Sequence, residues 1–115
     1  PGLERMLGPL SLPDFLRQVD GERKLVAPIC RGTLLVARSG LVKDRHVTGF
    51  HLGTQYPEFV IRPTVEQFGG ISSEDQPVVI DDNLISSRNP DDVVHFAGAI
   101  REWLLNTTQT QRKRA

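Results

Sequence analysis

The sequence has little cysteine, few histidines and no long apolar run. Cys30 is its one cysteine, so an internal disulfide framework is excluded. The three histidines, His46, His51 and His95, form no close pair, and we expect no bound metal. No apolar run approaches the roughly 18 residues that cross a membrane, and the first residues lack the basic-then-apolar pattern of a signal peptide. We therefore expect a soluble, cytoplasmic protein.

The chain also lacks net charge. Its 14 Lys and Arg balance 14 Asp and Glu, and 38% of its residues are hydrophobic. This balance gives no reason to expect nucleic acid or a membrane as a partner. A length of 115 residues suits a single hydrophobic core. We expect one domain over residues 1–105, followed by a polar, flexible tail over residues 106–115.

Helix and strand signals alternate along the chain, which predicts an α/β fold. A helix is expected after the capping residue Ser11 and ends at Gly21. Asn89 and Pro90 begin the most regular helix, whose apolar residues recur at spacings of three and four. The other expected elements are strands at 24–30 and 46–50, helices at 33–40 and 63–68, and a hairpin of strands 77–80 and 84–87.

The feature that can carry chemistry is Cys30, which stands between an apolar run and a helix. A nucleophile on a sharp strand-to-helix turn is lifted out of the sheet, and the first helical amides favour a thiolate and can hold an oxyanion. Gly32 would keep the turn uncrowded, and Arg31 would add positive charge beside the sulfur. The alternative is that Cys30 is an ordinary buried residue at a strand end.

Other polar residues have local explanations. Asp81 and Asp82 fall in the hairpin turn, whereas Asp91 and Asp92 fall in the first turn of a helix, where carboxylates are common without a metal. His46 is expected to be structural or solvated, and His95 to pack or be exposed on the last helix. Trp103 is expected in the core or at a subunit interface. Residues 86–89 either cap that helix or border the cysteine.

Three segments together resemble one known family. Residues 27–32 have the pattern Ala-x-x-Cys-x-Gly, residues 39–48 are SGLVKDRHVT, and residues 78–92 are VVIDDNLISSRNPDD. They resemble the cysteine elbow and two further motifs of the ThiJ/PfpI superfamily, which contains intracellular protease-like, glyoxalase and deglycase proteins. The resemblance covers residues 12–105. It implies a flavodoxin-like three-layer sandwich with a mainly parallel sheet, in which about the first third, including the first strands, is missing from this chain.

The same resemblance implies roles for particular residues. Cys30 takes the place of the nucleophile, and the backbone amides of Arg31 and Gly2 take that of the oxyanion hole, because Pro1-Gly2 resembles the end of the family's Pro-Gly-Gly loop. Gly32 and Ser87 would border the cysteine pocket.

The sequence departs from the family at the proton-transfer residue. Many members have His directly after the cysteine, whereas this chain has Arg31, which cannot act as a base. The nearest replacement is His51, which lies beyond the strand that ends in Thr48. The acidic residue that the family places near its first strand would belong to the missing part.

The resemblance implies a cofactor-free, cysteine-dependent hydrolase, glyoxalase or deglycase, active on small carbonyl or peptide-like substrates and assembled as a homo-oligomer. The alternative is a non-catalytic stress-response or redox-sensing protein that uses Cys30 as a reactive thiol, and Arg31 in place of His favours this alternative. A third reading is one half of a split protein, with the missing N-terminal segment as its partner.

Overall fold

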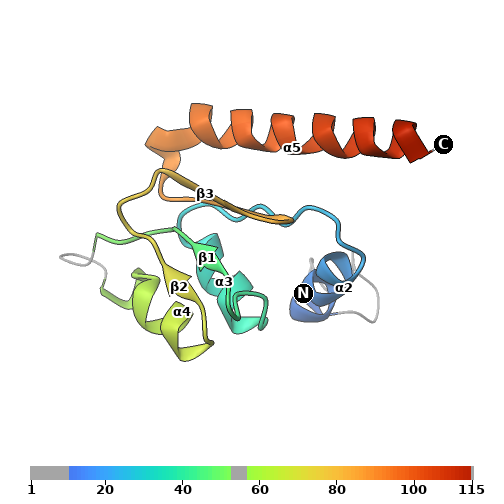
Figure 1. The fold of residues 1–115 in the computed structure, drawn as a ribbon. Helices are drawn as coiled ribbons and strands as arrows, with labels where there is room; N and C mark the ends of the chain where they lie inside the picture. Colours follow the sequence, from blue (N-terminus) through green and yellow to red (C-terminus); the bar gives the residue numbers. More distant parts are fainter. Residues whose placement is uncertain (1–10, 53–56, 115) are drawn as a thin grey trace.

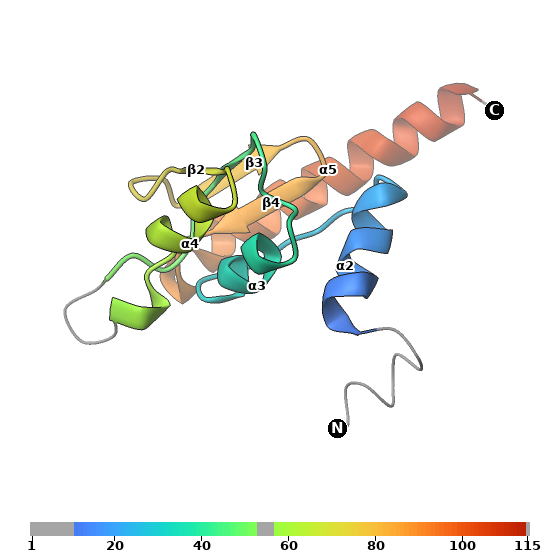
Figure 2. The ribbon, with the colours of Figure 1, turned by 90° about the horizontal axis from the view of Figure 1, so that it is seen from below.

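The computed structural model describes residues 11–52 and 57–114, which form three layers (Figure 1). Helix α5 (Val93–Arg114) covers one face of the strands. The opposite face carries α2 (Leu12–Gly21), α3 (Gly32–Arg38) and α4 (Arg62–Gln67), which Figure 2 shows from their own side. This arrangement agrees with the expected α/β sandwich.

The strands form two pairs. β1 (His46–Val47) is parallel to β2 (Ile71–Ser72), and β3 (Val78–Asp81) is antiparallel to β4 (Leu84–Ser87). The hairpin is therefore confirmed, whereas β2 was not expected from the sequence.

The expected strand at 24–30 is reduced to two parallel bridges on β4, Val26 with Leu84 and Ile29 with Ser87. Pro28 lies between these bridges and has no N–H to continue a ladder, which accounts for the gap. The expected strand at 46–50 is likewise short, because beyond β1 the N–H of Thr48 donates to the Ser86 hydroxyl at 2.9 Å instead of to a backbone carbonyl.

Helix starts follow the sequence signals. The Ser11 hydroxyl accepts the N–H of Asp14 at the start of α2, as expected. The Asn89 side chain caps a short 3-10 turn, η2 (Pro90–Asp92), which leads directly into α5. A second 3-10 turn, η1 (Pro57–Phe59), was not expected.

Helix α5 is longer than the apolar spacing predicts. It continues through residues 106–114, where a flexible tail was expected; this stretch contains neither Gly nor Pro to end the helix, and its last four residues, QRKR, favour helix. The Trp103 indole N–H donates to the Asp82 carbonyl at 2.9 Å and ties the helix to the hairpin turn. No helix within the described residues is both long and apolar enough to cross a membrane.

The hydrophobic core lies between the strands and the layer of α3 and α4. It contains apolar residues from both layers: Val26, Leu34, Val36, Ala37, Leu41, Val42, Val47, Ile61, Val65 and Leu84. By contrast, Phe96 is the one buried apolar residue of α5 among those whose side chains the structure describes. The face that carries α3 and α4 is therefore the better-packed one.

Candidate active site at the Cys30 turn

Cys30 adopts a backbone conformation that is unusual for its type. Its φ of 56° lies in the left-handed region, which costs a non-glycine residue about 1 to 2 kcal/mol. Both of its backbone polar groups are held, since its N–H donates to the Ser87 carbonyl at 2.9 Å and its carbonyl accepts the Phe50 N–H at 3.1 Å. Such a conformation persists only where the surroundings determine it. The predicted sharp turn at Cys30 is therefore present.

Gly49 packs closely against the Cys30 turn, where there is no room for a side chain. A Cβ atom added at Gly49 would lie 2.8 Å from the Cys30 carbonyl oxygen and 2.8 Å from the Thr33 hydroxyl, closer than atoms can pack. That hydroxyl in turn donates to the Thr48 carbonyl at 2.8 Å. Sequence reasoning missed this role of Gly49, and a glycine within the expected strand at 46–50 was the available signal.

The backbone amides of the two residues after Cys30, Arg31 and Gly32, have different roles. The Gly32 N–H donates to the Ile29 carbonyl at 2.9 Å, so this amide closes the turn and is not a candidate oxyanion donor. Gly32 itself borders an apolar cavity of about 190 Å³ together with Ala27 and Pro28. The Arg31 amide lies directly after the sulfur-bearing residue, at the cap position of α3.

His51 lies next in the chain to Phe50, whose N–H donates to the Cys30 carbonyl. This hydrogen bond brings the His51 segment to the turn. The histidine is half-buried, and its buried Nδ1 has no hydrogen-bond partner within the described residues. Cys30 is half-buried as a free thiol. Among residues 11–52 and 57–114 no hydrogen bond joins its sulfur to His51, so the dyad stays a prediction.

The other expected site residues are placed differently. Ser87 is fully buried, and its hydroxyl donates to the Pro77 carbonyl at 3.0 Å. Its N–H donates to the Pro28 carbonyl at 3.1 Å, so Ser87 supports the turn from within the sheet through its backbone. Gly2 lies outside the described residues.

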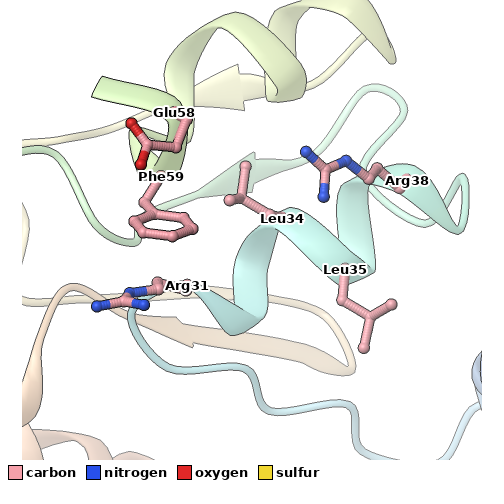
Figure 3. Close-up of a pocket in the computed structure, with 6 residues that line it drawn as sticks. All are labelled: Arg31, Leu34, Leu35, Arg38, Glu58 and Phe59. Atoms are coloured by element: carbon pink, nitrogen blue, oxygen red, sulfur yellow. The ribbon is translucent and has the colours of Figure 1, made fainter. Parts of the chain in front are cut away.

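The Arg31 side chain belongs to a second feature, a cavity shown in Figure 3. Its guanidinium stands over the Phe59 ring, 4.1 Å from the ring centroid. Both residues line a cavity of about 360 Å³ between α3 and η1. Sequence reasoning did not predict this cavity, because Phe59 is distant from Arg31 along the chain.

The acidic residues considered above serve local contacts. The Asp81 carboxylate accepts the His46 N–H at 2.8 Å, Asp82 pairs with Arg23, and Asp92 pairs with Arg88 at 3.1 Å. Within the described part of the chain, no group of three histidine, cysteine or acidic residues is placed to hold a metal ion.

Comparison with known proteins gives consistent results. A model of the DJ-1/PfpI family matches residues 2–102. The glutathione-independent glyoxalase DJ-1 of Schizosaccharomyces pombe is 36% identical over 92 residues, which are 76% of this chain and 43% of the relative. An uncharacterized protein of Archaeoglobus fulgidus is 39% identical over 77 residues, which are 67% of this chain and 40% of the relative.

A solved structure supports the same assignment. The crystal structure of Drosophila melanogaster DJ-1beta matches with a TM-score of 0.66 and 27% identity, over 79% of this chain and 44% of that chain. The present chain thus spans less than half the length of each of these three relatives.

Proposed function

Because the chain belongs to the DJ-1/PfpI family, we propose that it supplies the nucleophile of a cofactor-free enzyme, in which Cys30 attacks the carbonyl carbon of a small oxo compound. The observation that carries this proposal is the left-handed conformation of Cys30, held by hydrogen bonds on both sides. Strain of this kind gathers at functional sites. The similarity to a protein named as a glutathione-independent glyoxalase supports an oxoaldehyde as the substrate.

In the proposed reaction the Cys30 thiolate forms a carbon–sulfur bond with the aldehyde carbon, and the carbonyl electron pair moves to oxygen. The Arg31 amide stabilises this oxyanion until it takes up a proton. A base then removes the proton from the sulfur-bearing carbon, and the neighbouring carbonyl oxygen takes up a proton, which gives an enediol. A proton then returns to the neighbouring carbon while the hydroxyl on the sulfur-bearing carbon loses its proton, which leaves the thioester of a hydroxy acid. Water hydrolyses the thioester, so the net change is addition of one water and release of a hydroxy acid.

His51 is the proposed proton carrier of this chain. Its Nδ1 has no hydrogen-bond partner within the described residues, and the N–H of its neighbour Phe50 donates to the Cys30 carbonyl. A general base of this type contributes about 10²-fold to 10⁴-fold in rate. A carboxylate from outside this chain is the alternative proton carrier.

We also propose that a strand from a further segment of the protein completes the sheet beside residues 26–29. The N–H and carbonyl of Ala27 have no backbone partner within the described residues, and they face away from β4. An apolar cavity flanks the same stretch. Slower hydrogen exchange of the Ala27 amide in a longer protein than in this chain is the expected result, and equal exchange contradicts it.

The enzymatic proposal is tested by methylglyoxal consumption without glutathione, together with iodoacetamide labelling of Cys30 as a function of pH. We expect Cys30→Ser to abolish turnover and His51→Gln to lower it about 10²-fold or more. Turnover that survives Cys30→Ser contradicts the proposal. Rapid labelling without turnover, in a protein that contains the full family domain, supports the redox-sensing alternative instead.

A further inference from the structure

The cavity between α3 and η1 is built from one helical face and one short turn. Four residues of α3 and its cap, spaced three and four apart, line its floor. Glu58 and Phe59 of η1 form the opposite wall (Figure 3). The six lining residues are Arg31, Leu34, Leu35, Arg38, Glu58 and Phe59. Its volume of about 360 Å³ lies within the range of cavities that hold small organic ligands.

The middle of the cavity is apolar. Leu34 lies between Phe59 and Arg38 and is buried, whereas Leu35 is 36% exposed and points away from Phe59 (Figure 3). The Phe59 ring is held in place by the Arg31 guanidinium, which stands 4.1 Å from its centroid. Aromatic and aliphatic walls of this kind favour the hydrocarbon part of a ligand.

The positive charge of Arg38 stands beside this apolar centre. Arg38 makes no hydrogen bond or ion pair within the described residues, and its guanidinium points toward Leu34 (Figure 3). The Arg31 guanidinium stands over Phe59, and the Glu58 carboxylate points away from Arg38 (Figure 3). A guanidinium matches the two oxygens of a carboxylate with two parallel hydrogen bonds.

We propose that this cavity binds a small amphiphilic carboxylate, with its hydrocarbon part on Leu34 and Phe59 and its carboxylate on Arg38. The site does not require the thiol of Cys30, so it is independent of the catalytic proposal. A bare anion would leave the apolar walls in contact with water, and a cation would be repelled by the Arg38 guanidinium. Both ligand classes are therefore disfavoured.

Calorimetric titration with 4-phenylbutyrate tests the proposal. Because charged hydrogen bonds are the stronger ones, Arg38→Gln is expected to weaken binding about tenfold or more. The matched control Arg101→Gln removes an exposed arginine from α5 on the other face of the sheet and leaves binding unchanged. Phe59→Ala weakens binding, and Glu58→Gln strengthens it about twofold.

Three further comparisons complete the test. The uncharged 4-phenylbutanamide and inorganic phosphate are both expected to bind at least tenfold more weakly than 4-phenylbutyrate, because each lacks one of the two recognised parts. Equal binding of the amide, equal binding of phosphate, or equal effects of Arg38→Gln and Arg101→Gln would each overturn the proposal. Cys30→Ser is expected to bind 4-phenylbutyrate like the unchanged protein, whatever its turnover, so failure of the catalytic proposal is distinguishable.

Discussion

Two strand-to-helix connections lie side by side in this protein and are built in opposite ways. One passes through Cys30 into α3, and the other leaves β4 at Ser87 and enters α5. A hydrogen bond of 2.9 Å from the Cys30 N–H to the Ser87 carbonyl joins them. Because the two turns share the same surroundings, the difference between them comes from the residues at each turn.

The connection into α5 satisfies the rules of helix initiation. The Asn89 side chain accepts the Asp91 N–H at 3.0 Å, and Pro90 occupies the first helical position. Arg88 and Asp92 form two hydrogen bonds of 3.1 and 3.2 Å. The connection into α3 has no side-chain cap and a left-handed cysteine. One turn therefore favours folding, whereas the other stores strain where the thiol stands.

The largest expected effect comes from filling the space below the strained turn. Gly49→Ala places a methyl group 2.8 Å from the Cys30 carbonyl oxygen, so we expect the free energy of unfolding to fall by about 2 to 3 kcal/mol. Urea denaturation measures this change. Gly98→Ala is the matched control, because a Cβ there would have nothing within 4 Å. It should raise the free energy of unfolding by about 0.5 to 1 kcal/mol. Equal effects at the two glycines would show that the turn is not tightly packed.

The strain itself is measured by a pair of variants at Cys30. Cys30→Gly is expected to be more stable than Cys30→Ala by about 1 to 2 kcal/mol, because glycine adopts a φ of 56° without steric cost. Both variants remove the thiol, so their difference in urea midpoint reports the backbone. A Cys30→Ala protein as stable as Cys30→Gly would contradict the idea of a strained nucleophile turn.

The turn that leads into α5 should depend on its helix cap instead. Asn89→Ala removes the acceptor of the Asp91 N–H and is expected to lower the free energy of unfolding by about 1 kcal/mol. Asn89→Ser, which keeps a capping oxygen, serves as the control and should retain most of the stability. No loss in thermal or urea denaturation of Asn89→Ala would mean that the cap adds nothing to this helix start.

The smallest effect concerns the start of α2, the other helix with a side-chain cap. The hydrogen bond from the Ser11 hydroxyl, followed by that from Arg17, lowers the pKa of Asp14. The resulting stabilisation is present above the pKa of Asp14 in the unfolded chain and is lost as the pH falls through the lower folded pKa. NMR titration of Ser11→Ala should show the Asp14 pKa rising toward its ordinary value, and an unchanged pKa would contradict this assignment.

Elements that depend on adjacent residues were predictable from the sequence. The caps Ser11 and Asn89 and the hairpin are where the sequence places them, because the caps depend on hydrogen bonds between residues two or three apart and the hairpin joins two neighbouring strands through a short turn. The same holds for the turn at Cys30, which the motif of residues 27–32 indicated. The strand at 24–30 was overestimated, since Pro28 interrupts its pairing with β4.

Features that join distant residues were not predictable. The role of Gly49 depends on how closely its backbone approaches Cys30 and Thr33, and no local pattern encodes that distance. The cavity between α3 and η1 exists because Phe59 packs against Arg31 after the chain has folded back.

The amino-acid sequence by itself determined the family, the alternation of helix and strand, and the position of the one cysteine at a turn, because these follow from residue type and short-range spacing. The tertiary structure alone decided that this cysteine is held in a left-handed conformation by two neighbouring segments, and that Arg31 and Arg38 border an apolar cavity. Both facts arise from contacts between residues far apart in the chain, which only packing brings together.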